Sequence, residues 1–395
     1  MARLGELFAG YGGLGMGVEA ALGPVERVWV SEVDPAPSKV LARHWPDVPN
    51  LGDVTAIDWS QVEPVDILTG GFPCQDVSLA GRRAGLTDGT RSGLWSYMRD
   101  AIAALRPRLV VIENVRGLLS AQAGGAHDLG QCELCMASGG GHALRALGAV
   151  LGDVADLGFD AEWGLFPASG VGAAHRRERC FIIAWPADSE SSAGRVSNRD
   201  DAAATDSDRD LLRQHRGGAS AEKAGPEQGH GFADSGRGGG PLMPTPTASE
   251  HTGAGHAASK TGSPNLRTVV ELMPTPKAGD ADFGTPRTSG RPPEMSTHLA
   301  TRLAYRDFGD YAPAVAQWSA VIGRPAPAPT EVGEKGGTRL SPAFVEWLMG
   351  LPEGHVTSPD IGLTRTQQLK ALGNGVVPLQ AAEAVNQLME RKEAA

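Results

Sequence analysis

Short apolar runs alternate with stretches of helical period over residues 1–185 of the chain. Runs such as 4–8 and 109–112 have the length of buried strands, whereas residues 94–105 repeat their apolar side chains at helical spacing. Such alternation is typical of strand–helix–strand units, whose strands lie parallel. The pattern therefore predicts an α/β fold with a doubly wound, mostly parallel sheet. Its expected strands are residues 4–8, 28–30, 65–68, 109–112, 161–166 and 180–185.

Two reactive side chains follow successive strands of this predicted sheet. The run 65–68 leads into a proline-stiffened turn that carries Cys74, with the sequence Gly70-Gly71-Phe72-Pro73-Cys74-Gln75. The next run, 109–112, leads directly into Glu113. Because open α/β sheets bind ligands at the carboxyl ends of their strands, the sequence predicts a thiol and a carboxylate at neighbouring strand ends.

A glycine-rich turn joins the first expected strand to a helix. Gly10, Gly12 and Gly15 fit the pattern G-x-G-x-x-G, and Glu32 follows at the distance of an acidic residue that binds ribose hydroxyls. The motif predicts a nucleotide-like cofactor, and a tight turn without a ligand is the alternative. Asp53 is either a partner for an adenine amino group or a turn residue.

Composition bounds the class of protein. A chain of 395 residues with 41% hydrophobic and 21% charged residues is typical of a globular protein with two domains. No apolar run reaches the length of a membrane span and no signal peptide precedes Leu4, so we expect no membrane partner. Four cysteines favour a reducing compartment over a disulfide framework. The net charge of -10 disfavours nucleic acid as a partner, although a local basic cleft can lie within an acidic chain.

The chain changes character after Pro186. Residues 187–240 are rich in small and polar side chains with few large apolar ones, which favours long loops over a packed core. The pentapeptide Leu-Met-Pro-Thr-Pro then occurs twice, at 242–246 and 272–276, and its prolines favour extended backbone. Apolar and aromatic residues return at 299–321. The expected divisions of the chain are 1–185, 186–338 and 339–395.

Six elements, in their order along the chain, resemble those of the bacterial and phage cytosine-C5 DNA methyltransferases. Two depart from the family pattern: His175 stands in place of the usual glutamine, and Ser341 in place of threonine. The effect of His175 on the pocket is open. The elements are Phe8-Ala9-Gly10-Tyr11-Gly12-Gly13, Pro73-Cys74-Gln75, Glu113-Asn114-Val115, His175-Arg176-Arg177-Glu178-Arg179, Arg339-Leu340-Ser341-Pro342 with Glu346, and Gly373-Asn374-Gly375-Val376.

The resemblance implies a Rossmann-like class I methyltransferase domain that binds S-adenosylmethionine. Residues 1–185 would form this catalytic domain, 339–395 would complete it, and 186–338 would be an irregular target-recognition region. A cytoplasmic location follows, since the methyl donor and the DNA are both found there. The cofactor-binding residues that the resemblance implies are Phe8, Gly10, Gly12, Gly13, Glu32, Asp53, Val54, Pro73, Asn374 and Val376.

The resemblance also assigns catalytic roles. Cys74, as a thiolate, would add to C6 of cytosine and make C5 nucleophilic toward the methyl group. Glu113 would hydrogen-bond or protonate ring N3, and Arg179 would hold the base O2. Arg177, also counted with the catalytic set, would orient its neighbours. Because a duplex hides C6 inside the stack, the target cytosine would be flipped into the pocket.

Double-stranded DNA is the partner that this chemistry implies, and we expect the enzyme to act as a monomer. Residues 76–92 resemble the family's mobile catalytic loop, and a solvated surface loop is the alternative. A cognate restriction endonuclease is a further partner that the resemblance allows, while an orphan enzyme and phage self-protection stay open. The residues expected to contact DNA are Gln75, Ser78, Arg82 and Arg91.

Three rival functions share part of this pattern. An RNA cytosine-C5 methyltransferase would have the same core elements, although the long region before residue 339 favours DNA. A catalytically silent DNA-binding relative has no need of the full catalytic set. A nicotinamide-dependent dehydrogenase would share the glycine turn but needs neither Cys74 nor Glu113. Separately, Cys132 and Cys135 form either half of a zinc site or part of a surface loop, and we predict no metal.

Overall fold

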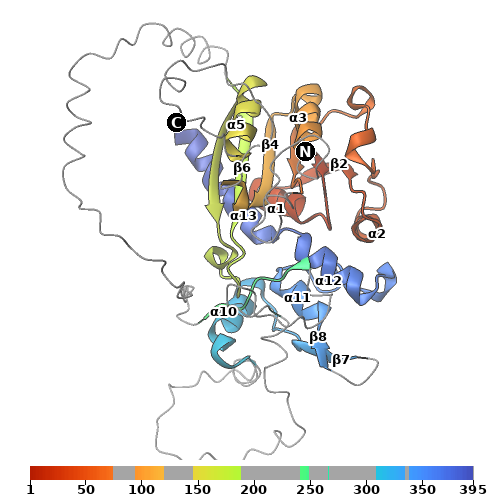
Figure 1. The fold of residues 1–395 in the computed structure, drawn as a ribbon, viewed down its shortest axis with the longest axis vertical. Helices are drawn as coiled ribbons and strands as arrows, with labels where there is room; N and C mark the ends of the chain where they lie inside the picture. The colour runs from red at the N-terminus through yellow and green to blue at the C-terminus, as the bar shows by residue number, and fades with distance from the viewer. Residues whose placement is uncertain are drawn as a thin grey trace, which may run out of the picture.

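The computed structural model describes residues 1–73, 94–119, 146–187, 241–248, 266, 308–333 and 338–394. A six-stranded sheet with the order β2-β1-β3-β4-β6-β5 forms the centre of this part (Figure 1). β1 pairs in parallel with β2 and β3, and β3 in parallel with β4, which confirms the predicted α/β class with a mostly parallel sheet. The strands are β1 (Ala2–Leu7), β2 (Val25–Ser31), β3 (Ile67–Gly70), β4 (Leu109–Val115), β5 (Phe159–Phe166) and β6 (Arg179–Pro186).

One strand of the sheet, β6, runs against the others. β6 pairs antiparallel with β4, and β5 pairs antiparallel with β6. The connection between them is short and contains the 3-10 helix η5 (Ala168–Val171) instead of a crossover helix, so β6 returns beside β5. Apolar runs alone carry no information on direction, and the alternation described above did not anticipate this hairpin.

Helices cover both faces of the sheet because successive side chains of each strand point to opposite faces. Val110 and Ile112 pack with α3 (Leu94–Leu105) and α5 (Ala146–Asp156), whereas Leu109 and Val111 pack with the opposite helices. These opposite helices are α1 (Gly13–Leu22) and α13 (Pro378–Ala394). The first and the last helix of the described chain therefore cover the same face of the sheet.

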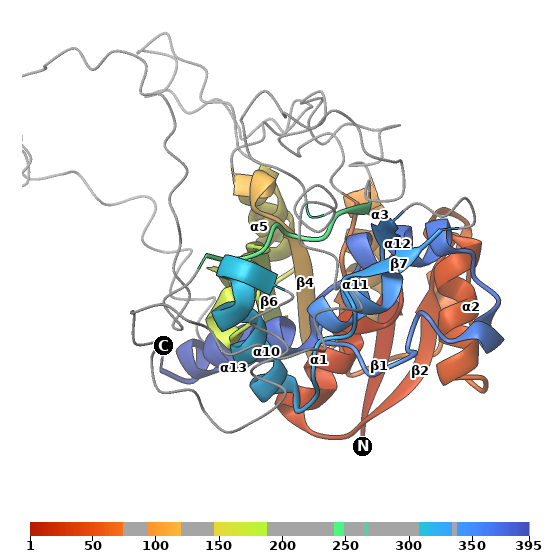
Figure 2. The ribbon, with the colours of Figure 1, turned by 90° about the horizontal axis from the view of Figure 1, so that it is seen from below.

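A second group of helices lies at one end of the sheet, below it in Figure 1 and nearer the viewer in Figure 2. Trp318 and Trp347 are fully buried in its apolar cluster. The expected division at 338 falls between two helices that share this cluster, α10 and α11. The group contains α10 (Ala312–Ile322), β7 (Thr330–Val332), β8 (Thr338–Leu340), α11 (Pro342–Leu348) and α12 (Arg365–Asn374).

The remaining helix, α2 (Pro35–His44), lies beside β2 at the edge of the sheet. Its N-cap is Asp34, whose Oδ1 accepts from the backbone N of Ala36 at 3.0 Å. No helix among the described residues is long and apolar enough to cross a membrane. The part of the chain that the structure describes also contains short 3-10 helices: η1 (Val54–Ala56), η2 (Trp59–Gln61), η4 (Arg116–Leu119), η8 (Gly309–Tyr311) and η9 (Pro359–Ile361).

Candidate active site

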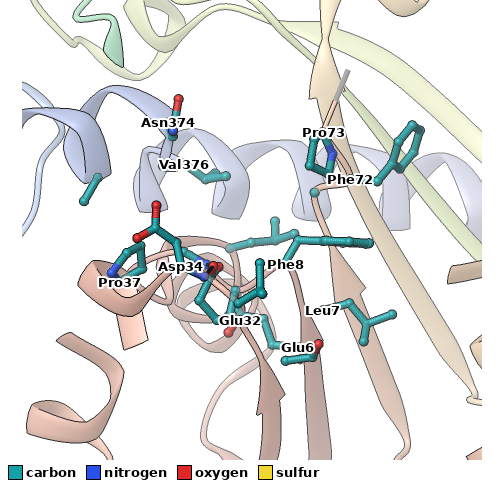
Figure 3. A pocket seen from close by; sticks show the side chains of 18 of the residues that line it. Glu6, Leu7, Phe8, Glu32, Asp34, Pro37, Phe72, Pro73, Asn374 and Val376 are labelled. Carbon is teal, nitrogen blue, oxygen red and sulfur yellow. Dashed lines mark hydrogen bonds between the residues drawn. The ribbon is translucent and has the colours of Figure 1, made fainter. Parts of the chain in front are cut away.

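A cleft of about 380 Å³ opens at the carboxyl ends of the parallel strands. In Figure 3, Asn374 and Val376 lie across the pocket from Phe8 and Glu32. The end of α12 therefore forms one wall, and the strand ends form the other. The residues expected to bind the cofactor that line this cleft are Phe8, Gly10, Glu32, Asp53, Val54, Pro73, Asn374 and Val376. Gly12, Gly13 and Arg177 are not among its lining residues.

The glycine-rich turn after β1 forms one side of the cleft. Phe8 and Gly10 both have positive φ, 52° and 55°, which reverses the chain sharply before α1. No atom lies within 4 Å of the position that a Cβ on Gly10 would occupy, so the space beside this residue is open to a ligand. The backbone N of Gly10 donates to Glu32 Oε2 at 2.8 Å, and this bond fixes the turn against the end of β2.

The carboxylate of Glu32 is held rigidly at the wall of the cleft. Its second oxygen, Oε1, accepts from the backbone N of Asp34 at 2.8 Å. Burial raises the pKa of Glu32, while the backbone donors oppose that rise. A carboxylate with fixed oxygens facing a cleft is suited to accept hydrogen bonds from hydroxyl groups of a ligand.

Asp53 is a turn residue, and it also lines the cleft. Its Oδ1 accepts from the backbone N and from the Oγ1 of Thr55, each at 2.9 Å, so it caps η1 as a turn residue does. Asp53 and its neighbour Val54 nevertheless line the cleft. The turn thus places a polar side chain where a ligand can reach it.

Glu113 and Arg179 meet at the inner end of the cleft. They lie on the adjacent antiparallel strands β4 and β6, where Glu113 pairs with Phe181 and Arg179 with Val115, so both side chains share one face. Arg179 Nε lies 3.0 Å from Glu113 Oε1, and the two side chains are only 17% and 12% exposed. Burial raises the pKa of Glu113, and the positive charge of Arg179 lowers it in opposition, with a raised pKa as the result.

The turn that leads to Cys74 runs beside this ion pair. A Cβ on Gly71 would lie 3.1 Å from Glu113 Oε2, which shows how closely the backbone passes the carboxylate. The buried side chain of Asn114 donates from Nδ2 to the backbone O of Phe72 at 3.1 Å. Gly71 and Phe72, which precede Cys74 in the sequence, are therefore held beside Glu113.

Several expected residues lie outside the described part of the chain. They are Cys74, Gln75, Ser78, Arg82 and Arg91 from the catalytic turn and loop, and Cys132 and Cys135 from the alternative zinc site. Among the residues that the structure describes, no group of three or more His, Cys, Asp or Glu side chains could hold a metal ion.

Arg177 lies behind the wall of the cleft and is buried. Its Nη1 donates to the backbone O of Pro246 at 3.0 Å, and its Nη2 donates to the backbone O of Gly373 at 3.1 Å and of Gly375 at 2.5 Å. Burial lowers its pKa to about 9, so the guanidinium keeps its charge at neutral pH. This side chain joins the segment 241–248 to the loop that forms one wall of the cleft.

We expect Arg177→Lys to lower the free energy of unfolding by about 1–3 kcal/mol, because a single ammonium cannot reach all the carbonyl groups and leaves buried acceptors unpaired. Urea unfolding followed by circular dichroism measures the change. The control is Arg116→Lys, whose exposed ion pair with Glu178 contributes less than about 1 kcal/mol. Equal stability of the two variants would contradict the role assigned to Arg177.

His175 does not line the cleft. Its ring is fully buried, and Nε2 lies 2.9 Å from the backbone O of Leu348 at the end of α11. Burial lowers its pKa to about 3, so the ring is neutral and donates from Nε2 to that oxygen. The residue that departs from the family pattern therefore joins the β5–β6 connection to the second group of helices.

Sequence reasoning missed two cleft contacts. Lys370 of α12 lines the cleft and pairs with Asp34 across it, with Nζ 2.8 Å from Oδ2. Asn114 anchors Phe72, in the turn that precedes Cys74, as described above. Asn114 could have been identified from the sequence, because it belongs to the Glu113-Asn114-Val115 element. Nothing in the sequence marks Lys370 as a neighbour of Asp34, a residue more than 300 positions away.

The sequence is similar to a family of known proteins and to several of its members. The family model described as C-5 cytosine-specific DNA methylase matches residues 2–226. The Neisseria gonorrhoeae Type II methyltransferase M.NgoBV is 32% identical over 181 residues, which are 45% of this chain and 40% of that protein. The Escherichia coli Type II methyltransferase M.Eco47II is 34% identical over 182 residues, 45% of this chain and 38% of that protein. The matched part is thus about two fifths of the length of these relatives.

A solved structure shares the architecture. The chain resembles the Schizosaccharomyces pombe Dnmt2 methyltransferase with a TM-score of 0.50 and 13% sequence identity, over 99% of each chain. At that identity the likeness concerns the fold alone. It agrees with the α/β class and the mostly parallel sheet found here.

Proposed function

Since the chain belongs to the C-5 cytosine-specific DNA methylase family, we propose that it transfers a methyl group from S-adenosylmethionine to C5 of cytosine in duplex DNA. One observation carries this proposal most: the buried Glu113–Arg179 pair beside the turn that leads to Cys74, at the inner end of a cleft suited to a nucleoside. A dehydrogenase has no use for such a pair. A cytosine ring offers N3 and O2 side by side, and these are the atoms that a carboxyl and a guanidinium can hold together.

The cleft fits S-adenosylmethionine by its size and its polar groups. The cavity of about 380 Å³ is in the range of small-molecule sites. Glu32 would accept hydrogen bonds from the ribose hydroxyls, and Asp53 would meet the adenine amino group beside Val54. Phe8 and Gly10 on one wall, and Asn374 and Val376 on the other, would enclose the rest, with Pro73 toward the reacting end. When bound, S-adenosylmethionine supplies an electrophilic methyl group.

Cys74 would make the cytosine reactive. Its thiolate adds to C6, forming an S–C6 bond and moving electron density toward C5. C5 would take the methyl group as the bond between that group and the donor's sulfur breaks, and water would accept the C5 proton. The S–C6 bond then breaks and N3 returns its proton to Glu113, which restores the aromatic ring and the free thiolate. Glu113 in its protonated form donates to N3 as negative charge develops there, and its raised pKa favours that form. Arg179 holds O2 and complements the same charge.

The proposed chemistry also bears on how the protein would bind DNA and on its partners. The target cytosine is flipped out of the duplex, and Gln75, Ser78, Arg82 and Arg91 contact the DNA around it. Double-stranded DNA is the substrate, and the enzyme acts as a monomer. A restriction endonuclease of the same specificity would be the natural partner. RNA methylation remains the rival activity on the same core.

Label transfer tests the proposal. Purified protein is incubated with tritiated S-adenosylmethionine and either duplex DNA or RNA of matched length. We expect label in the DNA and none above background in the RNA. Transfer to RNA alone would support the rival activity, and transfer to neither would contradict the proposed function. Bisulfite sequencing of the labelled DNA would then identify the target sequence.

We expect Glu32→Gln to weaken S-adenosylmethionine binding by about 10- to 100-fold, because the amide loses the charge and one acceptor, and bonds to charged groups contribute more than neutral ones. Isothermal titration calorimetry measures the dissociation constant. The control is Glu26→Gln, an exposed residue elsewhere on the same strand β2, which should leave it unchanged. Unaltered binding by Glu32→Gln would remove the ribose role.

A further inference from the structure

Tyr11 stands in the glycine-rich turn, yet its side chain turns away from the cleft and is fully buried. The ring packs in the apolar cluster of the second group of helices. Its hydroxyl donates to the backbone O of Val376 at 2.8 Å. Val376 lies across the cleft from Phe8 in Figure 3, and Gly10, one residue before Tyr11, also lines the cleft. The contact therefore joins the glycine-rich turn to the opposite wall.

The opposite wall is shaped to receive the ring. A Cβ on Gly375 would lie 1.9 Å from Tyr11 Cε1, a separation that no relaxed structure allows. The backbone of Gly375 has φ -77° and ψ 179°, which every residue type adopts with ease. Glycine is therefore needed at position 375 to leave room for the Tyr11 ring. The backbone conformation at this position does not itself require glycine.

The backbone of Tyr11 is fixed as well. His355 Nε2 lies 2.9 Å from the backbone O of Tyr11. Burial lowers the pKa of His355 to about 4, so its ring is neutral at physiological pH and donates to this oxygen. Burial also raises the pKa of the Tyr11 phenol, which therefore remains a donor. Tyr11 is thus bound at its carbonyl and at its hydroxyl to two different segments of the second group.

We propose that Tyr11 and Gly375 form a size-matched pair that pins the glycine-rich turn to the loop 373–376 and so sets the separation of the walls of the cofactor cleft. Tyr11 is a positioning residue in this scheme, because it does not line the cleft itself. The inference rests on the proposed function, since it concerns the affinity of this cleft for S-adenosylmethionine. Weakening the contact between Tyr11 and the loop 373–376 should lower the affinity for the cofactor much more than the rate of methyl transfer at saturating cofactor.

Tyr11→Phe tests the hydrogen bond alone and keeps the ring in place. We expect the dissociation constant for S-adenosylmethionine, measured by calorimetry, to rise by about 2- to 10-fold, the effect of one neutral hydrogen bond. KM for the cofactor should rise with it while kcat stays within about twofold. The control is Tyr97→Phe on α3, a partly exposed tyrosine that does not line the cleft, which should change neither constant.

Gly375→Ala tests the fit of the ring. In the wild-type background we expect at least about a tenfold loss of cofactor affinity, because the added methyl group must displace the ring or the loop. In a Tyr11→Ala background the same alanine should cost little, since the ring has been removed. Gly152→Ala, in a helix where nothing lies within 4 Å of the new Cβ, is the matched control and should bind like wild type.

The outcomes distinguish a failure of the positioning role proposed for Tyr11 and Gly375 from a failure of the proposed function. The proposed positioning role of Tyr11 is contradicted if Tyr11→Phe binds the cofactor as tightly as wild type. It is also contradicted if Gly375→Ala lowers the affinity equally in the wild-type and Tyr11→Ala backgrounds. Either result leaves the proposed function intact. A parallel fall of kcat and affinity in Tyr11→Phe also overturns the positioning role, because the effect would then not be confined to binding. Absence of S-adenosylmethionine binding by the wild-type protein contradicts the proposed cofactor, and the positioning role with it.

Discussion

Replacing Cys74 by alanine is expected to lower methyl transfer to DNA by at least about 10⁴-fold. Without a nucleophile at C6, the cytosine C5 is too weakly nucleophilic to accept the methyl group. Label transfer from tritiated S-adenosylmethionine measures the loss. Binding of the cofactor should persist in the variant, because the residues proposed to hold it remain in place.

Cys180 provides the matched control for this prediction. It is buried in β6, and burial raises its pKa to about 12, so it stays a protonated thiol. Cys180→Ala should retain activity within a few-fold of wild type. DNA that carries 5-fluorocytosine adds a direct readout, since the fluorine cannot leave as a proton does: wild type should form a denaturant-stable adduct, and Cys74→Ala none. Substantial activity of Cys74→Ala would exclude the covalent route.

Glu113→Gln is expected to reduce kcat by about 10²- to 10³-fold, because the amide can hydrogen-bond to N3 but cannot transfer a proton to it. The pH profile should change as well. The raised pKa of Glu113 means that its protonated form persists to higher pH than in an ordinary carboxyl group and is lost as pH rises through that pKa. The Cys74 thiolate has the opposite dependence, so kcat/KM of wild type should rise with pH and then fall.

In Glu113→Gln the alkaline fall should disappear, and kcat/KM should rise with pH to a plateau. Steady-state assays across the pH range in which the protein stays folded provide the test. Glu162→Gln on β5, a partly exposed residue outside the cleft lining, is the control and should keep the wild-type profile. An unchanged alkaline limb in Glu113→Gln would show that another group is responsible for it.

Local patterns were sufficient to predict the strands of the sheet. The run 109–112 reads as a buried strand because every residue in it is apolar, and Glu113 at its end reaches the cleft for the reason that governs all open α/β sheets. The glycine turn and Glu32 were predictable in the same way, since only α1 and β2 separate them along the chain. These elements depend on interactions within a few dozen residues.

What could not be predicted depends on contacts between distant segments. The direction of β6 is set by the short connection from β5, which leaves the apolar run itself unchanged. Arg177 was counted with the catalytic set, but its carbonyl partners, remote in sequence, hold it behind the cleft wall. Tyr11 meets a carbonyl 365 positions away, and no local pattern marks such a pair.

The measurement that tests the central claim most directly is identification of the methylated nucleoside. Duplex DNA treated with the protein and S-adenosylmethionine is digested to nucleosides and analysed by mass spectrometry against authentic standards. The account predicts 5-methyl-2′-deoxycytidine in the wild-type reaction, and none with Cys74→Ala. N4-methylcytosine, N6-methyladenine or no methylated nucleoside from the wild-type protein would contradict it.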